Sequence, residues 1–297
     1  MLHYQEITIA DQESLNEILR SHDFLACNQN FTTLFIWSPI YSQKWAVCDG
    51  HLIIRAEGNF YMPIGGGDPT AALEEIRREC REQGRPMCLI GVGDTEQRRL
   101  EAIYPGCFSF EDKREYFDYL YEAERLADLP GKKFHAKRNF INRFFSDNPE
   151  WSFEPITVEN LDQAWEMNRK WCQINGCAKN TGLMNEACAV RRCFENFESL
   201  NLIGGMLKAG KRVVAYSMAS LLGTRAVDVH IEKAFADVDG AYPLINREMV
   251  RHILTLHPDV QYINREDDTG DEGLRQAKLS YHPDILLRKW SAVWQNP

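Results

Sequence analysis

The run from Val227 to Lys233 carries a dense set of groups that could move a proton. The period of two of an extended strand places Asp228, His230 and Glu232 on one face and apolar side chains on the other. Burial beside other carboxylates would make Glu232 more basic, which suits a general base acting on an amine or alcohol nucleophile. We therefore expect Glu232, helped by His230, to be catalytic. A solvated strand face is the alternative interpretation.

The loop after this strand leads into a predicted helix. The first turn of a helix has unpaired backbone N–H groups and a partial positive charge, and it commonly holds a phosphate. The backbone here would hold an acyl donor and polarise its carbonyl as an oxyanion site. The residues expected to bind the donor are Asp239, Gly240, Ala241, Tyr242 and Asn246. An ordinary tight strand-to-helix connection is the alternative.

A second polar segment follows the next predicted strand. Loops that leave the carboxyl ends of strands are where open α/β sheets place ligands. Arg265, Arg275 and Lys278 could contact an anion of the substrate, whereas Asp267 could contact a cation. The hydroxyl of Tyr281 could act as a general acid in catalysis. The alternative is a solvated turn whose acids favour the start of the following helix.

A strongly basic stretch begins after a Pro-Gly pair. Residues 129–146 contain five lysines and arginines and no acid. On a helix, polar side chains of this stretch would form one row that could bind the phosphate of a coenzyme, a lipid headgroup or a transfer RNA. The residues expected to bind substrate are Lys137, Arg138 and Asn142, together with Lys233 on the strand described above. A linker helix with a solvated basic face is the alternative.

Nine cysteines are present, and no two of them form a Cys-x-x-Cys pair. Free thiols in a reducing cytosol are the natural interpretation. Cys172 and Cys177 are five residues apart, and on one helix this spacing rotates the second thiol well away from the first. A zinc site is therefore disfavoured, and we expect no metal.

The chain has 297 residues, a length that favours two domains. Its net charge of −9 opposes non-specific binding to phosphate backbones, so a contact with RNA would be confined to the basic stretch. The N-terminus has no basic segment followed by an apolar run, and no apolar stretch reaches the ~18 residues needed to span a bilayer. We expect a cytoplasmic protein without a transmembrane segment.

The two halves of the sequence predict the same order of elements, which suggests a duplicated mixed α/β (α+β) domain. Residues 1–125 predict a strand, helices, a β-meander, and then helix, strand, helix, strand. Residues 126–297 form the second predicted domain, in which the basic helix at 131–147 would lie at the interface. The strands expected in this half lie near residues 151–155, 200–208, 212–222, 225–234, 260–264 and 285–294.

Several segments of the sequence resemble one family. They are Asp118-Tyr119-Leu120-Tyr121, the run from Asp128 to Asn139, His230-Ile231-Glu232-Lys233-Ala234, and Gly273-Leu274-Arg275-Gln276-Ala277-Lys278 with Tyr281 and Pro283. They resemble the soluble domain of phosphatidylglycerol lysyltransferases and its soluble relatives, over nearly the whole chain. The resemblance implies two tandem GNAT-like acyl-CoA N-acyltransferase domains, each a mostly antiparallel mixed sheet flanked by helices. The Fem-type aminoacyl transferases share this fold.

The resemblance implies a transferase that moves an acyl or aminoacyl group to an amine or hydroxyl. Its donor would be acyl-CoA or an aminoacyl-tRNA, and its acceptor a small molecule, a peptide or a lipid headgroup. The alternative is a non-catalytic module that binds a small ligand or tRNA on a duplicated transferase fold. For a transferase, Glu232→Gln is expected to lower turnover by roughly a hundredfold with little loss of stability.

Overall fold

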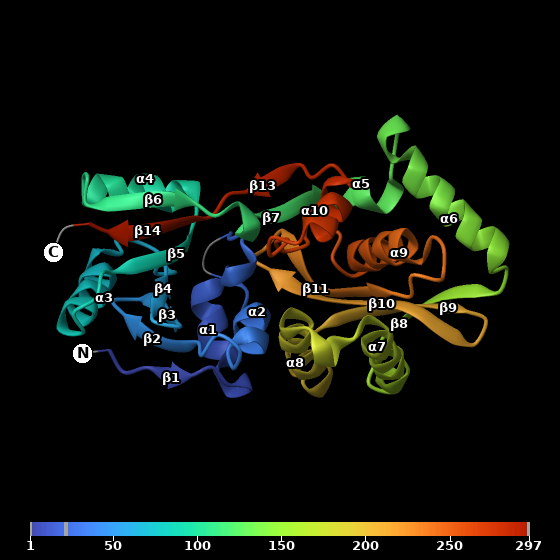
Figure 1. Ribbon diagram of the computed structural model, residues 1–297, viewed down its shortest axis with the longest axis horizontal. Helices are drawn as coiled ribbons and strands as arrows, with labels where there is room; N and C mark the ends of the chain where they lie inside the picture. Colours follow the sequence, from blue (N-terminus) through green and yellow to red (C-terminus); the bar gives the residue numbers. More distant parts are fainter. Residues whose placement is uncertain (1, 21–22, 296–297) are drawn as a thin grey trace. The chain divides into compact units, whose positions relative to one another are not determined.

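The structure, a computed structural model, describes residues 2–20 and 23–295 (Figure 1). The chain divides into two compact units. The first unit comprises Met1–Tyr119, Glu266–Leu279 and Ile285–Pro297, and the second comprises Leu120–Arg265 and Ser280–Asp284.

A mixed, mostly antiparallel sheet with strand order β1-β2-β3-β4-β5-β14-β6 forms the centre of the first unit. Strands β4 and β5 are parallel to each other. Asp49 and Gly50, a pair typical of tight hairpins, form the turn between β2 and β3 and have φ of 49° and 73°, as such turns require. The strands are β1 (Gln5–Glu6), β2 (Lys44–Cys48), β3 (His51–Ala56), β4 (Asn59–Tyr61), β5 (Cys88–Val92), β6 (Phe108–Asp112) and β14 (Trp290–Trp294).

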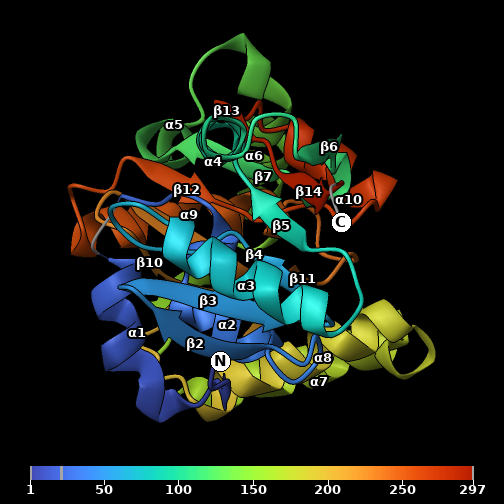
Figure 2. The ribbon, with the colours of Figure 1, turned by 90° about the vertical axis from the view of Figure 1, so that its left-hand side faces the viewer.

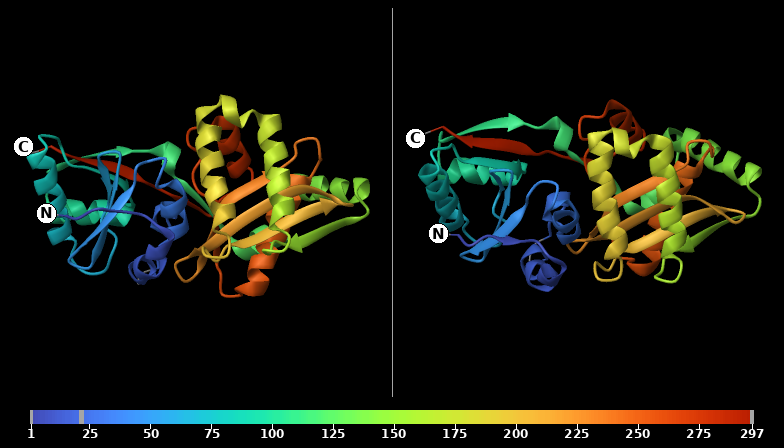
Figure 3. Two further views of the ribbon diagram at one scale, coloured as in Figure 1. Left: turned by 90° about the horizontal axis from the view of Figure 1, so that it is seen from below. Right: turned by 60° about the horizontal axis from the view of Figure 1, so that its bottom comes forward.

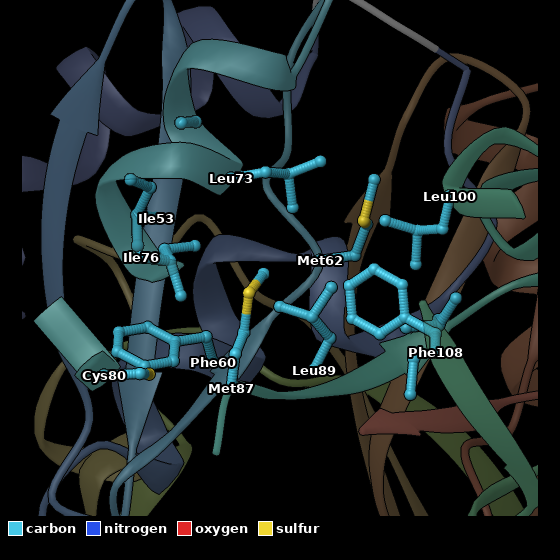
Figure 4. Close-up of a cluster of buried hydrophobic side chains, with 13 residues drawn as sticks. Ile53, Phe60, Met62, Leu73, Ile76, Cys80, Met87, Leu89, Leu100 and Phe108 are labelled. Carbon is cyan, nitrogen blue, oxygen red and sulfur yellow. The ribbon is translucent and has the colours of Figure 1, made fainter. Parts of the chain in front are cut away.

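The apolar face of one helix, α3, closes the main core of this unit (Figure 2). Leu73, Ile76 and Cys80 of α3 follow one another at helical spacing, and they are buried in one cluster with Ile53 of β3 and Leu89 of β5 (Figure 4). The helices of the first unit are α1 (Gln12–Leu19), α2 (Phe31–Trp37), α3 (Thr70–Glu82), α4 (Asp94–Ile103) and α10 (Glu272–Leu279).

The C-terminal strand β14 belongs to the first sheet, where it pairs antiparallel with both β5 and β6. The first unit therefore contains the first 119 residues and two later segments, 266–279 and 285–297. This differs from the predicted division near residue 125, which assigns the whole chain from 126 onward to the second domain. A short apolar strand shows its pattern of burial in its sequence but not the sheet that it joins. The strand before it, β13, spans Ile285–Leu287.

The second unit is built on a sheet whose strands follow the order β7-β12-β11-β10-β9-β8. Strands β11 and β12 are parallel, and the remaining neighbours in this order are antiparallel. The strands are β7 (Asp118–Glu122), β8 (Trp151–Pro155), β9 (Ile203–Ala209), β10 (Arg212–Leu222), β11 (Ala226–Ala234) and β12 (Tyr262–Asn264). Both sheets are thus mostly antiparallel, as predicted.

Helices cover both faces of this second sheet. Helices α7 and α8 lie side by side on one face, and α9 lies on the other (Figures 1 and 3). Helix α6 packs against α9, and its apolar residues Ile141 and Phe144 are buried, as is Phe134 in the turn just before it. The helices are α5 (Ala123–Asp128), α6 (His135–Asp147), α7 (Leu161–Asn175), α8 (Thr181–Glu195) and α9 (Ala241–Leu256). Short 3₁₀ turns span Ile9–Asp11, Cys27–Gln29, Arg114–Tyr116, Lys132–Phe134 and Cys177–Lys179.

Cys172 and Cys177 form a disulfide, so the expectation of free thiols is wrong for this pair. Helix α7 ends at Asn175, and Gly176 adopts a left-handed φ of 68°. The chain therefore turns back, and the two Cα atoms lie 5.1 Å apart, within the range that a disulfide bridges. The predicted rotation of the second thiol assumed one continuous helix. The other seven cysteines, all among the described residues, form no disulfide.

No helix within residues 2–20 and 23–295 has both the length and the apolar content needed to cross a membrane.

Candidate active site in the second unit

The carboxylate of Glu232 on β11 is held by two other elements of the second unit. Its Oε1 lies 2.7 Å from Nη2 of Arg265, the residue after β12. Its Oε2 accepts a hydrogen bond of 2.9 Å from Nδ2 of Asn246 on α9. The side chains of Glu232 and Arg265 are only 10% and 12% exposed. The parallel pairing of β11 with β12 and the packing of α9 on β11 bring these three residues together.

The described contacts of the Glu232 carboxylate are thus a guanidinium and an amide, and together they hold its side chain in one orientation. The role of Glu232 as a general base stays a prediction.

A β-bulge interrupts the predicted alternation along β11. Met218 of β10 pairs with Ile231 and Ala219 pairs with Val229, so His230 is an extra residue in the strand. Its Nε2 lies 2.8 Å from Oγ of Ser220, which the sequence analysis did not identify. Its Nδ1 lies 3.8 Å from Oδ2 of Asp228. Burial lowers the pKa of His230, so its imidazole is neutral at neutral pH.

Two buried tyrosines lie next to Arg265. Its guanidinium carbon is 4.8 Å from the ring centre of Tyr281 and 5.7 Å from that of Tyr121. Burial opposes the charged form of Arg265, but Glu232, Tyr121 and Tyr281 together outweigh this effect, and the pKa of Arg265 is raised. Burial also raises the pKa of Tyr281, so its hydroxyl keeps its proton. Tyr121 was missed as a site residue; its only sequence signal is its place in the segment that resembles the family.

Lys137 of α6 completes the cluster. Its Nζ lies 3.9 Å from the ring centre of Tyr281, so Lys137 and Arg265 contact the same ring. Burial and the nearby Arg265 charge lower the pKa of Lys137 to about 8, although Glu232 acts in the opposite direction. An amine with a pKa near neutrality can accept a proton from a substrate. The structure thus places a proton acceptor next to an ion pair and a protonated phenol.

The loop that was expected to hold the donor is closed against α6. A Cβ atom on Gly240 would lie 2.2 Å from the carbonyl oxygen of Phe140, so this glycine allows the loop to approach the helix. The N–H of Ala241 donates to the carbonyl of Val238, and Ala241 is fully buried. Oδ2 of Asp239 lies 2.6 Å from Nη1 of Arg143. Tyr242 is 39% exposed. Of the five residues that were predicted to bind the donor, only Asn246 forms a hydrogen bond with Glu232 in the described structure.

Three of the predicted substrate-binding residues in this unit have other partners or positions. Arg138 donates to the carbonyls of Leu129 and Gly131 and thereby holds the turn before α6. Asn142 is exposed on α6. Lys233 lies on the other face of β11, where its Nζ is 3.3 Å from Oε1 of Glu186.

The remaining predicted residues, Asp267, Arg275 and Lys278, belong to the first unit. Arg275 donates two hydrogen bonds, of 2.9 and 2.8 Å, to the buried carboxylate of Asp268. Lys278 donates to the main-chain carbonyl of Asp267. Burial raises the pKa of Asp267. These groups stabilise the turn that precedes α10 and bind one another.

Comparison with known proteins gives a family match over most of the chain. A family model described as phosphatidylglycerol lysyltransferase, C-terminal, matches residues 20–293. A crystal structure of a conserved protein of unknown function from Bacteroides thetaiotaomicron is 35% identical and covers 99% of this chain and 100% of its own, with a TM-score of 0.94. The structure of L-PGS from Bacillus licheniformis is 12% identical over 97% of this chain and 93% of its own, with a TM-score of 0.65.

More distant structures share the fold alone. FemX, 8% identical, covers 97% of this chain and 96% of its own with a TM-score of 0.58. A tandem GNAT protein from the clavulanic acid biosynthesis pathway, also 8% identical, covers 100% of this chain and 99% of its own with a TM-score of 0.50. These likenesses confirm the predicted tandem GNAT-like fold. The chain spans about half the length of a curated relative that it matches, an uncharacterised protein of Mycoplasmoides gallisepticum that is 23% identical over 58% of this chain and 54% of its own.

Proposed function

We propose, from the premise that this chain belongs to the family of the phosphatidylglycerol lysyltransferase C-terminal domain, that its second unit transfers an acyl or aminoacyl group to an amine or hydroxyl acceptor. The donor is an acyl-CoA thioester or an aminoacyl-tRNA ester. The acceptor is a small molecule, a peptide or a lipid headgroup.

The observation that supports the proposal is the position of Lys137, whose Nζ lies 3.9 Å from the ring centre of Tyr281 beside the Glu232–Arg265 ion pair. Burial and the Arg265 charge lower the pKa of Lys137 to about 8. Acyl transfer requires a base for the acceptor, an acid for the leaving group and positive charge near the carbonyl oxygen. Lys137, Tyr281 and Arg265 supply these three functions. Glu232 and Asn246 position Arg265, and His230 supports the strand that carries Glu232.

The proposed reaction proceeds in one displacement. Nζ of Lys137 takes the proton of the acceptor amine or hydroxyl, which attacks the carbonyl carbon of the donor. A new C–N or C–O bond forms, and the C–S bond of the thioester or the C–O bond of the ester breaks. The hydroxyl of Tyr281 gives its proton to the leaving sulfur or oxygen and regains one from the ammonium of Lys137. Arg265 stabilises the negative charge that develops on the carbonyl oxygen.

One observation favours a second candidate, a non-catalytic module that binds a ligand or tRNA. The loop at Gly240, where a donor carbonyl was expected to bind, packs at this glycine against the backbone of α6. A binding module would keep the cationic cluster of Lys137 and Arg265 and would consume no donor.

Donor consumption by the full chain distinguishes the two candidates. Acetyl-CoA, palmitoyl-CoA and lysyl-tRNA are each supplied with a panel of amines, peptides and phosphatidylglycerol vesicles. The transferase hypothesis predicts enzyme-dependent cleavage of at least one donor, lowered by roughly a hundredfold or more in Lys137→Met. Lys133→Met, which removes an exposed lysine of the turn before α6, is the matched control and keeps its activity. Donor binding without cleavage in the presence of every acceptor would contradict the proposal and support the binding module.

A further inference from the structure

The first unit contains a cavity of ≈ 430 Å³ at the C-terminal end of α3, where β5 begins and β14 ends. All of its lining residues belong to this unit. The charged residues of the lining are three arginines, Arg77, Arg81 and Arg85, without an acid. In a chain with a net charge of −9, a cavity with only cationic charges in its lining is a local site of attraction for an anion.

The three guanidinium groups differ in how firmly they are held. Arg77 lies with its guanidinium carbon 5.0 Å from the ring centre of Trp294, and Nη2 is 3.1 Å from Oε2 of Glu74. Its Nε is buried and has no hydrogen-bond partner in the described structure. Arg85 is oriented by Oε1 of Gln83, at 2.7 Å, and by a main-chain carbonyl. Arg77 and Arg85 are therefore held in position before a ligand binds, and the buried Nε–H of Arg77 could still donate a hydrogen bond.

Arg81 is the third cation and lies on the exposed side of the last turn of α3. Within residues 2–20 and 23–295, no carboxylate forms an ion pair with it. Its side chain can therefore move toward an anion in the cavity without breaking an internal contact. Arginine suits this role because its planar donors match two phosphate oxygens at once.

The apolar residues of the lining include Cys80, Met87 and Trp294, and Cys80 and Met87 are each 2% exposed. The volume falls at the lower end of the range of small-molecule sites, roughly 300–1,000 Å³. A lining that combines apolar residues with cations fits a ligand that joins a flat, weakly polar group to a phosphate.

The helix dipole explains only part of this arrangement. A cation in the last turn of a helix interacts favourably with the unpaired carbonyls there, which accounts for Arg81. It does not account for Arg77, one turn earlier and next to Trp294, or for Arg85, which follows the end of the helix at Glu82. The helix dipole therefore does not explain why all three arginines line one cavity.

We propose that this cavity of the first unit binds a nucleoside phosphate, with its base or sugar against the apolar lining residues and its phosphate on Arg77, Arg81 and Arg85. The phosphate can come from a free nucleotide or from a phosphodiester at the end of an RNA. The proposal is independent of the transferase activity assigned to the second unit.

Calorimetric titration of the full chain tests this site directly. The probes are ADP, adenosine as the analogue without phosphate, and a ten-nucleotide single-stranded RNA. We expect ADP or the RNA to bind saturably, and adenosine to bind at least tenfold more weakly than ADP. In Arg81→Gln, the affinity for the probe that carries a phosphate is expected to fall by roughly tenfold. Binding of ADP identifies the free nucleotide as the source, and binding of the RNA alone identifies the phosphodiester.

Arg78→Gln is the matched control, because Arg78 lies on the same helix and pairs with Glu75 but does not line the cavity. This variant should change affinity by less than about twofold, the size expected for loss of one surface charge at a distance. The proposal is overturned if neither phosphate-bearing probe binds, or if Arg81→Gln and Arg78→Gln bind as the unchanged chain does.

Discussion

At the scale of single residues, the two central groups of the candidate active site differ in their contacts. Lys137 has no carboxylate in direct contact among its described partners, and burial with the Arg265 charge lowers its pKa to about 8. Glu232, by contrast, contacts the guanidinium of Arg265 and the amide of Asn246. The pKa of Lys137 therefore allows this amine to accept a proton, and Glu232 holds Arg265 in place.

The first residue-scale prediction concerns the titration of Lys137. Competitive acetylation of amines, read by mass spectrometry, should show Lys137 half deprotonated near pH 8, because its pKa is lowered to about 8 from 10.5. Since the unfolded chain binds the extra proton, Lys137 costs stability below pH 8, and this cost disappears as the pH rises toward 10.5. A labelling profile of Lys137 without a midpoint near pH 8 would contradict the assignment.

The second residue-scale prediction concerns the stability of Glu232→Gln. The sequence analysis expects little loss, but this substitution leaves the buried guanidinium of Arg265 without its anion. We therefore expect unfolding in urea to show a loss of about 3 kcal/mol. Removal of both charges, in Glu232→Gln with Arg265→Met, should recover part of this loss, because two residues in contact are not additive. If Glu232→Gln alone is as stable as the unchanged chain, the Glu232–Arg265 ion pair contributes nothing to the free energy of unfolding.

At the scale of elements, a bulge and a close helix contact determine where the side chains of the site lie. The extra residue His230 in β11 changes the face to which its neighbours point. Gly240 allows the start of α9 to approach the backbone of α6, which carries Lys137. The site thus depends on how α6, α9 and β11 pack together within the second unit.

Gly240→Ala tests this packing. The new Cβ would lie 2.2 Å from the Phe140 carbonyl, and the residue has a φ of 79°, so both a clash and backbone strain are expected. We expect a loss of roughly 3 kcal/mol or more in the free energy of unfolding. Gly210→Ala is the control, since its φ is 57° and its Cβ would meet nothing closer than 4.0 Å. That variant should lose only the strain, about 1 kcal/mol. Equal losses in the two variants would exclude the clash.

The order of elements could be predicted from the sequence because periodicity and turn residues are local signals. The hairpin at Asp49 and the buried side of α6 follow from such signals. Helix α8 was not predicted, although Asn180 caps it by accepting a hydrogen bond from the N–H of Leu183. The bulge at His230 and the partner of Glu232 depend on the pairing of strands and on the approach of Arg265, and neither is encoded in a local pattern.

At the scale of the whole molecule, the chain leaves its first unit after residue 119 and returns to it twice. Residues 266–279 and 285–297 join the first unit, where β14 lies between β5 and β6. A strand in the middle of a sheet should lose protection only when that sheet opens.

Native-state hydrogen exchange tests this connectivity. The amides of β14 should exchange with the same opening free energy as those of β5 and β6, because they share backbone hydrogen bonds. They should differ from the amides of β10 and β11 in the second unit whenever the two units open separately. Exchange of β14 with the amides of β10, and not with those of β5, would contradict the described topology.

The most direct test of the central claim is the pH dependence of single-turnover donor cleavage, measured for the unchanged chain and for Lys137→Met with the donor that the chain consumes. We predict that the cleavage rate of the unchanged chain rises with pH and is half-maximal at a pH of about 8, the pKa of Lys137. The rate rises because only the neutral amine of Lys137 can take the proton of the acceptor. The variant should be slower by roughly a hundredfold and should lack this rise. Identical rates and pH profiles for the two proteins would contradict the account of Lys137 as the base.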